Sequence, residues 1–364
     1  MQEVPGTHEV VGTLITGDRP VDVAMWHSFW DDLGEGTSHE RCERAVALLA
    51  SLLTQVPDER SVGALVDSLH ERHATEEPPL EDAVNIVGTG GGPSTFNMST
   101  ATAFVAAALG VRIVKSGSRA YTSRYGSIDV LELLGVPLTR SHEATHESLE
   151  DFGIAFAGPH VYPRELTLLA KNIMPVEMRR LGRFFNTIGP FLAAVPAQCQ
   201  VTGVSDRSRL PLLGHLATHH CERAVWLCSN DVGVDELVSF ADNVIRHDDG
   251  TEVRITPDAL GLTPGTIEEL RPALDPDSVA RQFRALLEGD AEPAAIESIA
   301  LNAASLVVAS GLDDDWVTAF EAAMEAIEEG VALELLERLR DQGPGEVPVH
   351  LHARKRSATL TPNA

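Results

Sequence analysis

Apolar residues in the first part of the chain recur at the spacing of amphipathic helices. Val23–Leu33 and Glu40–Leu53 carry them at mixed intervals of three and four residues, and Ser61–His73 repeats the pattern. Such spacing places the apolar side chains on one helical face, which has to pack against another element. The pattern therefore predicts a small N-terminal helical domain over residues 1–80, which helices from within 142–192 could join.

From residue 81 onward, short apolar runs alternate with longer helical stretches. The predicted strands are Val84–Val87, Val111–Val114, Ile154–Ala157, Gln200–Gly203, Ala224–Cys228, Asn243–His247 and Glu252–Ile255. The predicted helices are Thr100–Leu109, Ile128–Leu134, His142–Phe152, Pro163–Leu169, Arg207–Thr218, Asp277–Leu287, Glu292–Ser310 and Asp313–Leu339. Strands separated by helices predict an α/β domain over 81–345, with a mostly parallel central sheet flanked by helices. Residues 247–251 are expected to form a hairpin turn, and residues 346–364 a disordered tail.

Glycine and hydroxyl residues follow the first two predicted strands. The first strand ends in Gly88–Gly92, and Asn97, Ser99 and Thr100 then open a helix. The second ends in Lys115–Arg119. Glycine lets a backbone approach an anion closely, and the N–H groups at a helix start point toward it. A glycine loop alone is often only a structural turn, but two such loops one βαβ unit apart favour a ligand with more than one phosphate.

A pair of adjacent carboxylates, Asp235 and Glu236, follows the predicted strand Ala224–Cys228. Carboxylates at a strand end are typical Mg²⁺ ligands, because Mg²⁺ prefers oxygen and bridges to substrate phosphates. The chain has 54 acidic residues, so an isolated Asp-Glu pair would by itself indicate only solvated surface.

Composition narrows the possible partners. The chain has 364 residues, of which 43% are hydrophobic and 23% charged, as expected of a globular protein. A net charge of −26 argues against nucleic acid and anionic membranes, which need clustered cations. No apolar run is long enough to predict a transmembrane helix, and no signal pattern or cysteine motif is recognised. We therefore expect a cytoplasmic protein with free thiols.

Lysine is scarce. It occurs only at Lys115, Lys171 and Lys355, and one of these lies inside the second glycine motif. Genomic base composition would account for the preference for arginine over lysine. Adaptation to a cytoplasm of high salt, where acidic surfaces retain hydration, is the alternative when the acidity is considered as well. The sequence leaves both explanations open.

The two glycine motifs resemble those of the anthranilate phosphoribosyltransferase family. Its members carry a GTGGD loop, an N-x-S-T helix start and a KHGNR…SS…GSAD block in this order. The resemblance spans about residues 10–340 and includes a PVRxxLGxRTxFNxxGP-like segment at Asn172–Pro190 and a Gly-Met-Asp-Glu-like segment ending at Glu236. The matching positions in the glycine motifs are Gly88, Thr89, Gly90, Gly91, Asn97, Ser99, Thr100, Lys115, Gly117, Arg119, Ser123, Gly126, Ser127 and Asp129.

The resemblance implies an enzyme that takes phosphoribosyl from phosphoribosyl pyrophosphate with Mg²⁺, needs no side-chain nucleophile and forms a homodimer. The implied donor-binding residues are Gly88, Thr89, Gly90, Gly91, Asn97, Ser99, Thr100, Lys115 and Ser123. Ser99, Asp235 and Glu236 are the implied metal ligands. The acceptor pocket is expected at Ser116, Ser118, His160 and Arg179.

Four positions depart from the family pattern. Gly92 stands where the family has Asp, Ser116 where it has His, Ser118 where it has Asn, and Glu177 where an arginine follows Pro-Val. An arginine replaced by a glutamate would turn attraction for a carboxylate into repulsion. We therefore predict a divergent paralogue that uses an aromatic amine or heterocyclic acceptor, either anthranilate through altered contacts or a different compound. The alternatives are a pyrimidine-nucleoside-phosphorylase-like enzyme and a non-catalytic relative that binds a ligand or nucleic acid.

Overall fold

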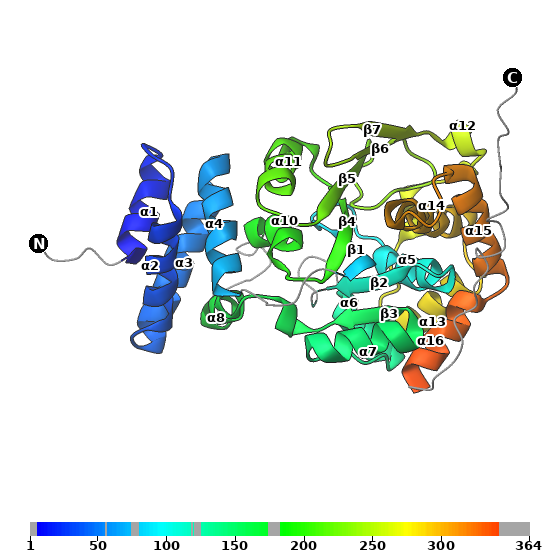
Figure 1. Ribbon diagram of the computed structural model, residues 1–364, viewed down its shortest axis with the longest axis horizontal. Helices are drawn as coiled ribbons and strands as arrows, with labels where there is room; N and C mark the ends of the chain where they lie inside the picture. Colours follow the sequence, from blue (N-terminus) through cyan, green and yellow to red (C-terminus); the bar gives the residue numbers. More distant parts are fainter. Residues whose placement is uncertain are drawn as a thin grey trace, which may run out of the picture.

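A computed structural model describes residues 6–54, 57–73, 80–117, 119, 125–173 and 183–341 (Figure 1). Its strands are β1 Leu80–Gly88, β2 Arg112–Ser116, β3 Ile154–Ala157, β4 Ala197–Gly203, β5 Ala224–Asn230, β6 Asn243–Arg246 and β7 Glu252–Ile255. The helices up to β4 are α1 Gly6–Thr16, α2 Val23–Gly34, α3 Ser38–Thr54, α4 Glu59–Arg72, α5 Met98–Ala108, α6 Ser127–Leu134, α7 His142–Phe152, α8 Arg164–Ile173 and α10 Arg183–Leu192, with the 3₁₀ turn η1 at Pro159–Val161. Beyond β4 follow η2 Arg207–Arg209, α11 Leu210–His219, α12 Pro257–Leu260, η3 Ile267–Leu270, α13 Pro276–Leu287, α14 Pro293–Ser310, α15 Trp316–Glu328 and α16 Val331–Asp341.

The N-terminal helices α1–α4 pack around a buried aromatic cluster at the blue end of Figure 1. Trp26 and Trp30 lie one turn apart on α2 with stacked rings 6.2 Å apart, and Phe29 meets Trp30 edge-on at 5.0 Å. The Trp30 indole donates to the Ser68 hydroxyl at 3.0 Å, which ties α2 to α4. Asp58 caps α4 by accepting from the Ser61 N–H. The predicted helices of this region are confirmed, and α1 is an addition that the sequence pattern did not predict.

The seven predicted strands all form, and they join one sheet in the order β3-β2-β1-β4-β5-β6-β7. The pairs from β3 to β5 are parallel, whereas β6 and β7 run antiparallel at the edge. The predicted hairpin turn is present, with the His247 N–H donating to the Thr251 carbonyl at 2.9 Å. In the parallel part, the register pairs Asn85 of β1 with Gln200 of β4, so their side chains share one face of the sheet. The prediction of a mostly parallel, helix-covered sheet is confirmed.

Hydrophobic clusters cover both faces of the sheet. On one face α5 and α14 are almost wholly buried, and α13, α15 and α16 pack around them. On the other face α10 and α11 share a core with the N-terminal helices and with Leu169 and Ile173 of α8. Among the described residues, α14 is the one helix long and apolar enough to cross a membrane, and 78% of it is buried inside the fold. Its composition is that of a core helix.

The structure corrects one predicted helix. The segment predicted as a single helix over residues 313–339 is two helices, α15 and α16, that meet at Gly330. Gly330 has φ +72°, a left-handed conformation that ends α15 and redirects the chain. Asp315 begins α15 by accepting from the Thr318 N–H. The helix α10, with Pro190 in its last turn, is a further addition.

α8 and α10 pack against the N-terminal helices, although they follow three strands of the sheet in the chain. α8 contacts α2 and α3, and α10 contacts α3 and α4. We propose on this basis that α8 and α10 belong with the helical domain. The predicted tail, residues 346–364, lies outside the described residues.

Candidate functional site

A cleft of about 1050 Å³ lies where the carboxyl ends of β1 and β2 face α8 and α10. Parallel strands direct their C-terminal ends to the same edge of a sheet, and this is where ligands bind in open α/β sheets. The predicted site residues that line the cleft are Gly88, Thr89, Gly90, Gly91, Asn97, Ser99, Lys115, Ser116, Asp235 and Glu236. The sequence motifs, far apart in the chain, thus come together in one cavity.

The glycine loop after β1 lies directly against Asp235. The Gly90 N–H donates to Asp235 Oδ2 at 2.7 Å. A Cβ atom at Gly88 would lie 2.1 Å from the same oxygen, so only glycine allows this approach. Gly90 and Gly91 have φ +66° and +84°, which is a conformation that favours glycine. The loop therefore requires these glycines both for its own path and for its contact with the carboxylate.

Lys115 is almost completely buried, with 3% of its surface exposed, at the end of β2. Its ammonium group donates to the Ile86 carbonyl at 2.8 Å and to Ser99 Oγ, in the first turn of α5, at 3.2 Å. Burial lowers the pKa of Lys115 to about 8, and the charges of Glu236 and Asp235 act in the opposite direction. Lys115 thus connects the end of β2 to the start of α5, the helix that follows β1.

Asp235 and Glu236 stand in a loop that other side chains hold in place. Asn230 donates to the carbonyls of Val234 at 2.9 Å and of Glu236 at 2.7 Å. Burial raises the pKa of both carboxyl groups, and for Glu236 the adjacent Asp235 raises it further, while Lys115 opposes the shift. Glu236 Oε2 is buried and has no hydrogen-bond partner in the described part of the chain. A buried carboxylate oxygen without a partner, beside a second carboxylate, is what a divalent cation would satisfy.

The described residues contain no group of three or more His, Cys, Asp or Glu side chains that could hold a metal ion by themselves. Mg²⁺ does not require such a group, because it keeps several waters and binds through one or two carboxylates plus substrate phosphates. The donor set of Asp235, Glu236 and the Ser99 hydroxyl therefore fits Mg²⁺ that arrives with a phosphorylated substrate.

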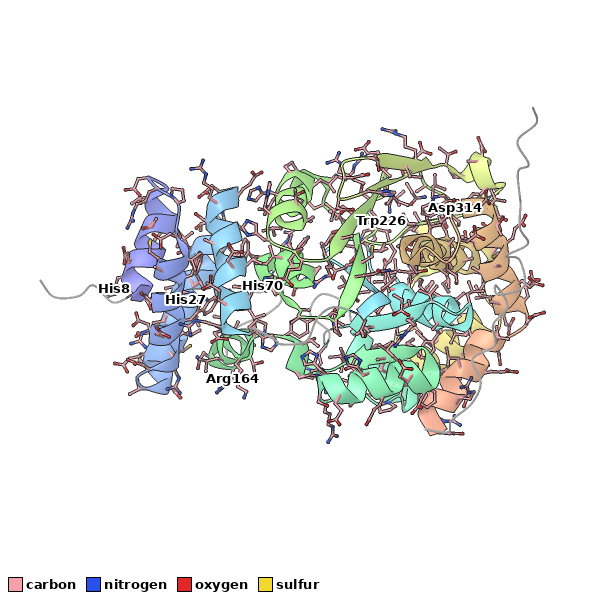
Figure 2. The ribbon with its side chains drawn as sticks, in the orientation of Figure 1. His8, His27, His70, Arg164, Trp226 and Asp314 are labelled. Atoms are coloured by element: carbon pink, nitrogen blue, oxygen red, sulfur yellow. The ribbon has the colours of Figure 1, made fainter. Side chains whose placement is uncertain are left out.

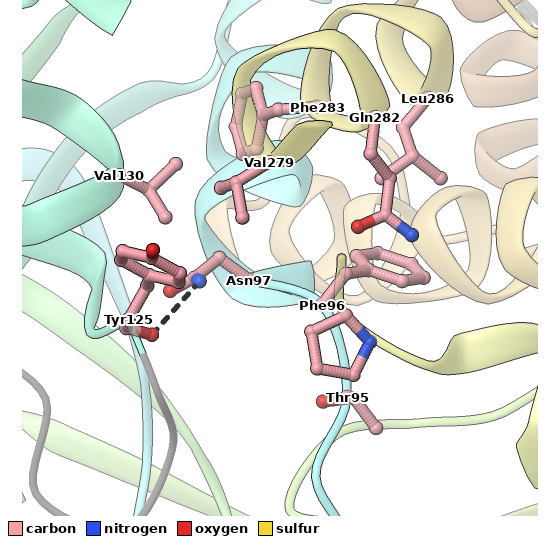
Figure 3. Close-up of a pocket in the computed structure, with 10 residues that line it drawn as sticks. Thr95, Phe96, Asn97, Tyr125, Val130, Val279, Gln282, Phe283 and Leu286 are labelled. Atoms are coloured by element: carbon pink, nitrogen blue, oxygen red, sulfur yellow. Dashed lines mark hydrogen bonds between the residues drawn. The ribbon is translucent and has the colours of Figure 1, made fainter. Parts of the chain in front are cut away.

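Asn97 joins the loop after β1 to the loop after β2. Figure 3 shows its side-chain amide donating to the Tyr125 carbonyl, at 3.2 Å. Beside this contact is a small cavity of about 20 Å³, bounded by Val130, Val279 and Phe283 among others, which has room for about one water molecule. Asn97 therefore fixes the spacing of the two loops at the edge of the cleft.

The opposite wall of the cleft is formed by α8, α10 and the chain around Tyr162. Facing this wall, at the end of β2, Ser116 is 1% exposed, and its N–H donates to Asn85 Oδ1 at 3.4 Å. The Tyr162 hydroxyl donates to the Gly117 carbonyl at 3.5 Å. This wall presents small polar groups and apolar helix faces, and its one lysine is Lys171 of α8.

Two of the predicted residues lie elsewhere. Thr100 is fully buried in α5 and does not line the cleft. His160 is not part of the cleft wall either, and its ring instead meets that of His142 edge-on at 5.0 Å. Ser118, Ser123 and Arg179 lie outside the described residues, so the structure does not place them.

The sequence analysis missed Tyr162, which lines the cleft, and Ser205, which holds the glycine loop. Ser205 Oγ donates to the Gly90 carbonyl at 2.6 Å, and its N–H donates to Thr89 Oγ1 at 3.4 Å. Ser205 comes two residues after the end of β4, the neighbour of β1 in the sheet. The sequence signal for Ser205 was its position just after the predicted strand that became β4, at the edge of the sheet where the two glycine motifs meet. Tyr162 had no such signal.

Comparison with known proteins agrees with the family resemblance of the two glycine motifs. The model of the glycosyl transferase family, a/b domain, matches residues 80–333. The anthranilate phosphoribosyltransferase of Geobacillus stearothermophilus is 34% identical over 83% of this chain and 89% of its own. That of Aeropyrum pernix is also 34% identical, over 80% of this chain and 85% of its own.

Solved structures of anthranilate phosphoribosyltransferases share the fold of this chain. Anthranilate phosphoribosyltransferase from Thermus thermophilus superposes with a TM-score of 0.75 at 28% identity, covering 93% of this chain and 99% of that one. The enzyme from Saccharomyces cerevisiae, solved in complex with PRPP and Mg, gives a TM-score of 0.77 over 92% and 97% of the two chains. Its identity is 22%, so it supports the fold alone. On the sequence match, the chain belongs to the anthranilate phosphoribosyltransferase family of glycosyltransferases.

Proposed function

We propose that this protein is a Mg²⁺-dependent phosphoribosyltransferase that uses phosphoribosyl pyrophosphate (PRPP) and an aromatic amine or heterocyclic acceptor. The observation that supports this most is the convergence of the glycine loop, buried Lys115 and the Asp235–Glu236 pair in one cleft. These are an anion cradle, a fixed cation and a pair of oxygen ligands. Together they suit a pyrophosphate that leaves from a sugar.

The donor side has the groups that the reaction needs. Breaking the bond between C1 of the ribose and pyrophosphate develops positive charge on the sugar and negative charge on the leaving group. Catalysis then depends on stabilising the leaving group and on holding the acceptor opposite to it. The N–H groups of the glycine loop and the ammonium group of Lys115 can bind phosphate oxygens, and Asn97 keeps their two loops at a fixed spacing. No side-chain nucleophile is required.

Asp235, Glu236 and Ser99 are the residues that would hold Mg²⁺. The ion would neutralise charge on the pyrophosphate as that group leaves. The chain's own contribution is to hold the two carboxylates against the loop, through the bond from the Gly90 N–H and the bonds of Asn230 to its own loop. The buried, unpartnered Glu236 Oε2 is the observation that favours a cation here.

The acceptor side supports divergence from the family pattern. Ser116 lines the cleft where the family has His, and it is bonded to Asn85 of the same sheet. On the donor side, Gly92 stands where the family has Asp, and a Cβ there would lie 2.3 Å from the Gly233 carbonyl oxygen. Glu177, in place of the family's arginine, lies outside the described residues. We therefore propose that anthranilate is either a poor acceptor or is held by contacts that differ from those of its relatives.

Two measurements test this function. Calorimetric titration with PRPP should give binding that requires Mg²⁺, and pyrophosphate release should depend on an added acceptor. With anthranilate as acceptor we expect turnover well below that of the Geobacillus stearothermophilus relative, measured side by side. No Mg²⁺-dependent PRPP binding would refute the transferase, and turnover equal to that of the relative would refute the proposal that anthranilate is a poor acceptor.

We further propose that the protein is cytoplasmic and acts as a homodimer through its N-terminal helices. The support is the family membership and the absence of a membrane-facing apolar helix in the described residues, since α14 is buried. Sedimentation or light scattering of the purified chain would test the dimer.

A further inference from the structure

A row of buried polar side chains crosses the sheet beneath the cleft. The Asn85 amide, on β1, donates to Gln200 Oε1 on β4 at 2.9 Å and approaches the Ser116 hydroxyl on β2 at 3.5 Å. Arg223, which directly precedes β5, donates through Nε to the same Gln200 oxygen at 3.1 Å. Asn85 and Gln200 have no exposed surface. These four residues, Ser116, Asn85, Gln200 and Arg223, form a continuous chain that we name the polar relay.

The far end of the polar relay holds the C-terminus of α10. The Pro190 carbonyl accepts from Gln200 Nε2 and from Arg223 Nη2, each at 3.1 Å, and the Ala193 carbonyl accepts from Arg223 Nη2 at 3.2 Å. The last carbonyls of a helix lack partners within it, and a cation there is favoured by the helix dipole. α10 lines the cleft through Phe185, Gly189 and Pro190 among others. The relay therefore connects one wall of the cleft to the end of β2.

The charge of Arg223 is unusual in this setting. Its hydrogen bonds in the described structure go only to neutral oxygens, and burial lowers its pKa. Removing a cation from water without an anionic partner is unfavourable. The planar guanidinium nevertheless suits the task, because its fork reaches Gln200, Pro190 and Ala193 together, which a lysine cannot do.

The relay has no end among the proposed donor-binding groups. Its two ends are Ser116 and Pro190, and both line the cleft. The donor-side groups have separate bonds: Gly90 to Asp235, and Lys115 to Ile86 and Ser99. None of the relay's hydrogen bonds involves those donor-side groups. Tyr162 adds a contact beside the relay, because its hydroxyl donates to the carbonyl of Gly117, the residue after Ser116, at 3.5 Å.

We propose that Gln200 and Arg223 are positioning residues for the acceptor: the polar relay fixes the distance between α10 and Ser116, and so the width of the acceptor pocket. The proposal rests on the proposed phosphoribosyl transfer. It adds that acceptor recognition depends on residues that do not touch the acceptor.

The first test is kinetic, with Mg²⁺ present and anthranilate as the acceptor probe, and each substrate is varied while the other is held at saturation. Gln200→Leu and Arg223→Met should raise the KM for anthranilate about tenfold or more, while the KM for PRPP changes less than about threefold. The ratio of the two effects, at least about 3.3, corresponds to ~0.7 kcal/mol. Arg223→Lys keeps the charge but not the fork, and should fall between Arg223→Met and the natural chain. Ser68→Ala is the matched control, because it removes a buried hydrogen bond to Trp30 far from the cleft and should leave both KM values unchanged.

The second test does not require turnover. Hydrogen exchange should become faster over Arg183–Leu192 in Gln200→Leu and Arg223→Met, while the exchange of α2 and α4 stays as in the natural chain. In Ser68→Ala, exchange should become faster in α2 and α4 and stay unchanged over Arg183–Leu192. Unchanged exchange in α10, or equal increases in the KM of anthranilate and of PRPP, would overturn the positioning role. A natural chain that binds no PRPP would refute the proposed function, and the exchange data would still decide whether the relay holds α10.

Discussion

Asp235 connects two parts of the site that come from distant segments. Its carboxylate accepts from the Gly90 N–H and lies so close to Gly88 that no side chain fits there. The same residue adjoins Glu236, whose Oε2 has no partner within the described chain. One carboxylate therefore both shapes the glycine loop and forms half of the proposed Mg²⁺ site. The two roles can be separated by a variant that keeps the shape and removes the charge.

Asp235→Asn should weaken Mg²⁺-dependent PRPP binding at least about tenfold, or ~1.4 kcal/mol, with the fold retained. An asparagine keeps an oxygen for the Gly90 N–H but loses the charge that attracts the cation. Calorimetry with and without Mg²⁺ measures the effect. The control is Asp231→Asn, an exposed residue of the same loop whose carboxylate accepts from the Asp242 N–H. Equal affinity in the Asp235 variant would remove this residue from the metal site.

Gly88→Ala should be destabilising by about 1–3 kcal/mol, because the new Cβ overpacks against the Asp235 carboxylate. It should also abolish PRPP binding, since either the loop or the carboxylate has to move. Thermal unfolding and calorimetry would show both effects. Gly214→Ala is the matched control: nothing lies within 4 Å of a Cβ at this position in α11, and alanine should stabilise the helix by roughly 0.5–1 kcal/mol. A Gly88→Ala variant as stable as the Gly214→Ala variant would show that the loop tolerates a side chain.

At the scale of elements, histidines gather where α4 meets the α/β part of the chain. Figure 2 labels His70, which lies on the side of α4 toward α10, and its Nε2 is 2.7 Å from the Phe191 carbonyl. His73, at the end of α4, lies near His142 and His160. Buried ring nitrogens of these last three residues have no hydrogen-bond partner in the described structure. The junction thus contains imidazoles that folding removes from water.

The contribution of these buried histidines to stability should therefore fall as the pH decreases from about 7 to 5. Burial is the largest cause that lowers the pKa of His70, His73 and His160 below the ordinary value of 6.5. The folded state then binds fewer protons than the unfolded state in this range. The stabilisation that comes from these uncharged histidines is therefore complete above pH 6.5 and is lost as the pH falls below it. Thermal unfolding at several pH values would measure the decline, which we expect to amount to several degrees.

His160→Phe isolates one of these groups. Phenylalanine fills a similar volume and takes up no proton, so the variant should lose less stability between pH 7 and 5 than the natural chain does. Replacing a polar group that has no partner by an apolar one should leave stability at pH 7 unchanged or higher. His39→Gln is the control, because the side chain of His39 is 83% exposed on α3. An unchanged pH profile for His160→Phe would exclude this residue from the effect.

The elements of the α/β part could be predicted well because their signals are local. Each strand is a short apolar run bounded by turn residues, and β1 with its glycine loop and α5 follows a recognisable order. The break between α15 and α16 was missed, since apolar spacing continues across Gly330 and only its left-handed conformation marks the end. α10 was missed because it contains Pro190 and Gly189, which normally argue against a helix.

The site could be predicted on its donor side and not on its acceptor side. Glycine loops and a carboxylate pair are chemical signals that can be seen one segment at a time. The polar relay has no such signal, because Asn85, Gln200 and Arg223 are separated by long stretches and meet only through the strand register. His160 shows the opposite case: its place in a familiar segment suggested the pocket, but its ring packs on His142.

At the scale of the whole molecule, the dominant property is excess negative charge. There are 54 acidic residues against 28 basic ones, so many carboxylates have no cation to pair with. Ion pairs do occur, such as Arg112 with Asp82 at 3.1 Å and with Glu150 at 2.6 Å, but these are partly exposed. Exposed pairs contribute little individually. Repulsion among the remaining carboxylates should therefore outweigh the pairs.

This balance predicts that salt stabilises the protein. Raising KCl from 0.1 M to 1 M shortens the screening length from about 10 Å to about 3 Å, which weakens the repulsion that is spread over the surface more than the attraction in close pairs. The thermal midpoint should rise by several degrees over this range. KCl is preferred to sulfate salts, because sulfate also strengthens hydrophobic burial by exclusion from the surface.

The same KCl titration distinguishes the two explanations of the composition, which are genomic base composition and adaptation to a cytoplasm of high salt. A neutral osmolyte such as sucrose, matched for its effect on water activity, serves as the control for non-electrostatic stabilisation. If KCl raises the thermal midpoint by much more than the osmolyte does, the acidic residues affect stability through their charge, as expected of a protein suited to high salt. A midpoint that stays level or falls would mean that pairs such as Arg112 with Glu150 dominate. In that case the scarcity of lysine is better explained by the base composition of the genome than by the solvent.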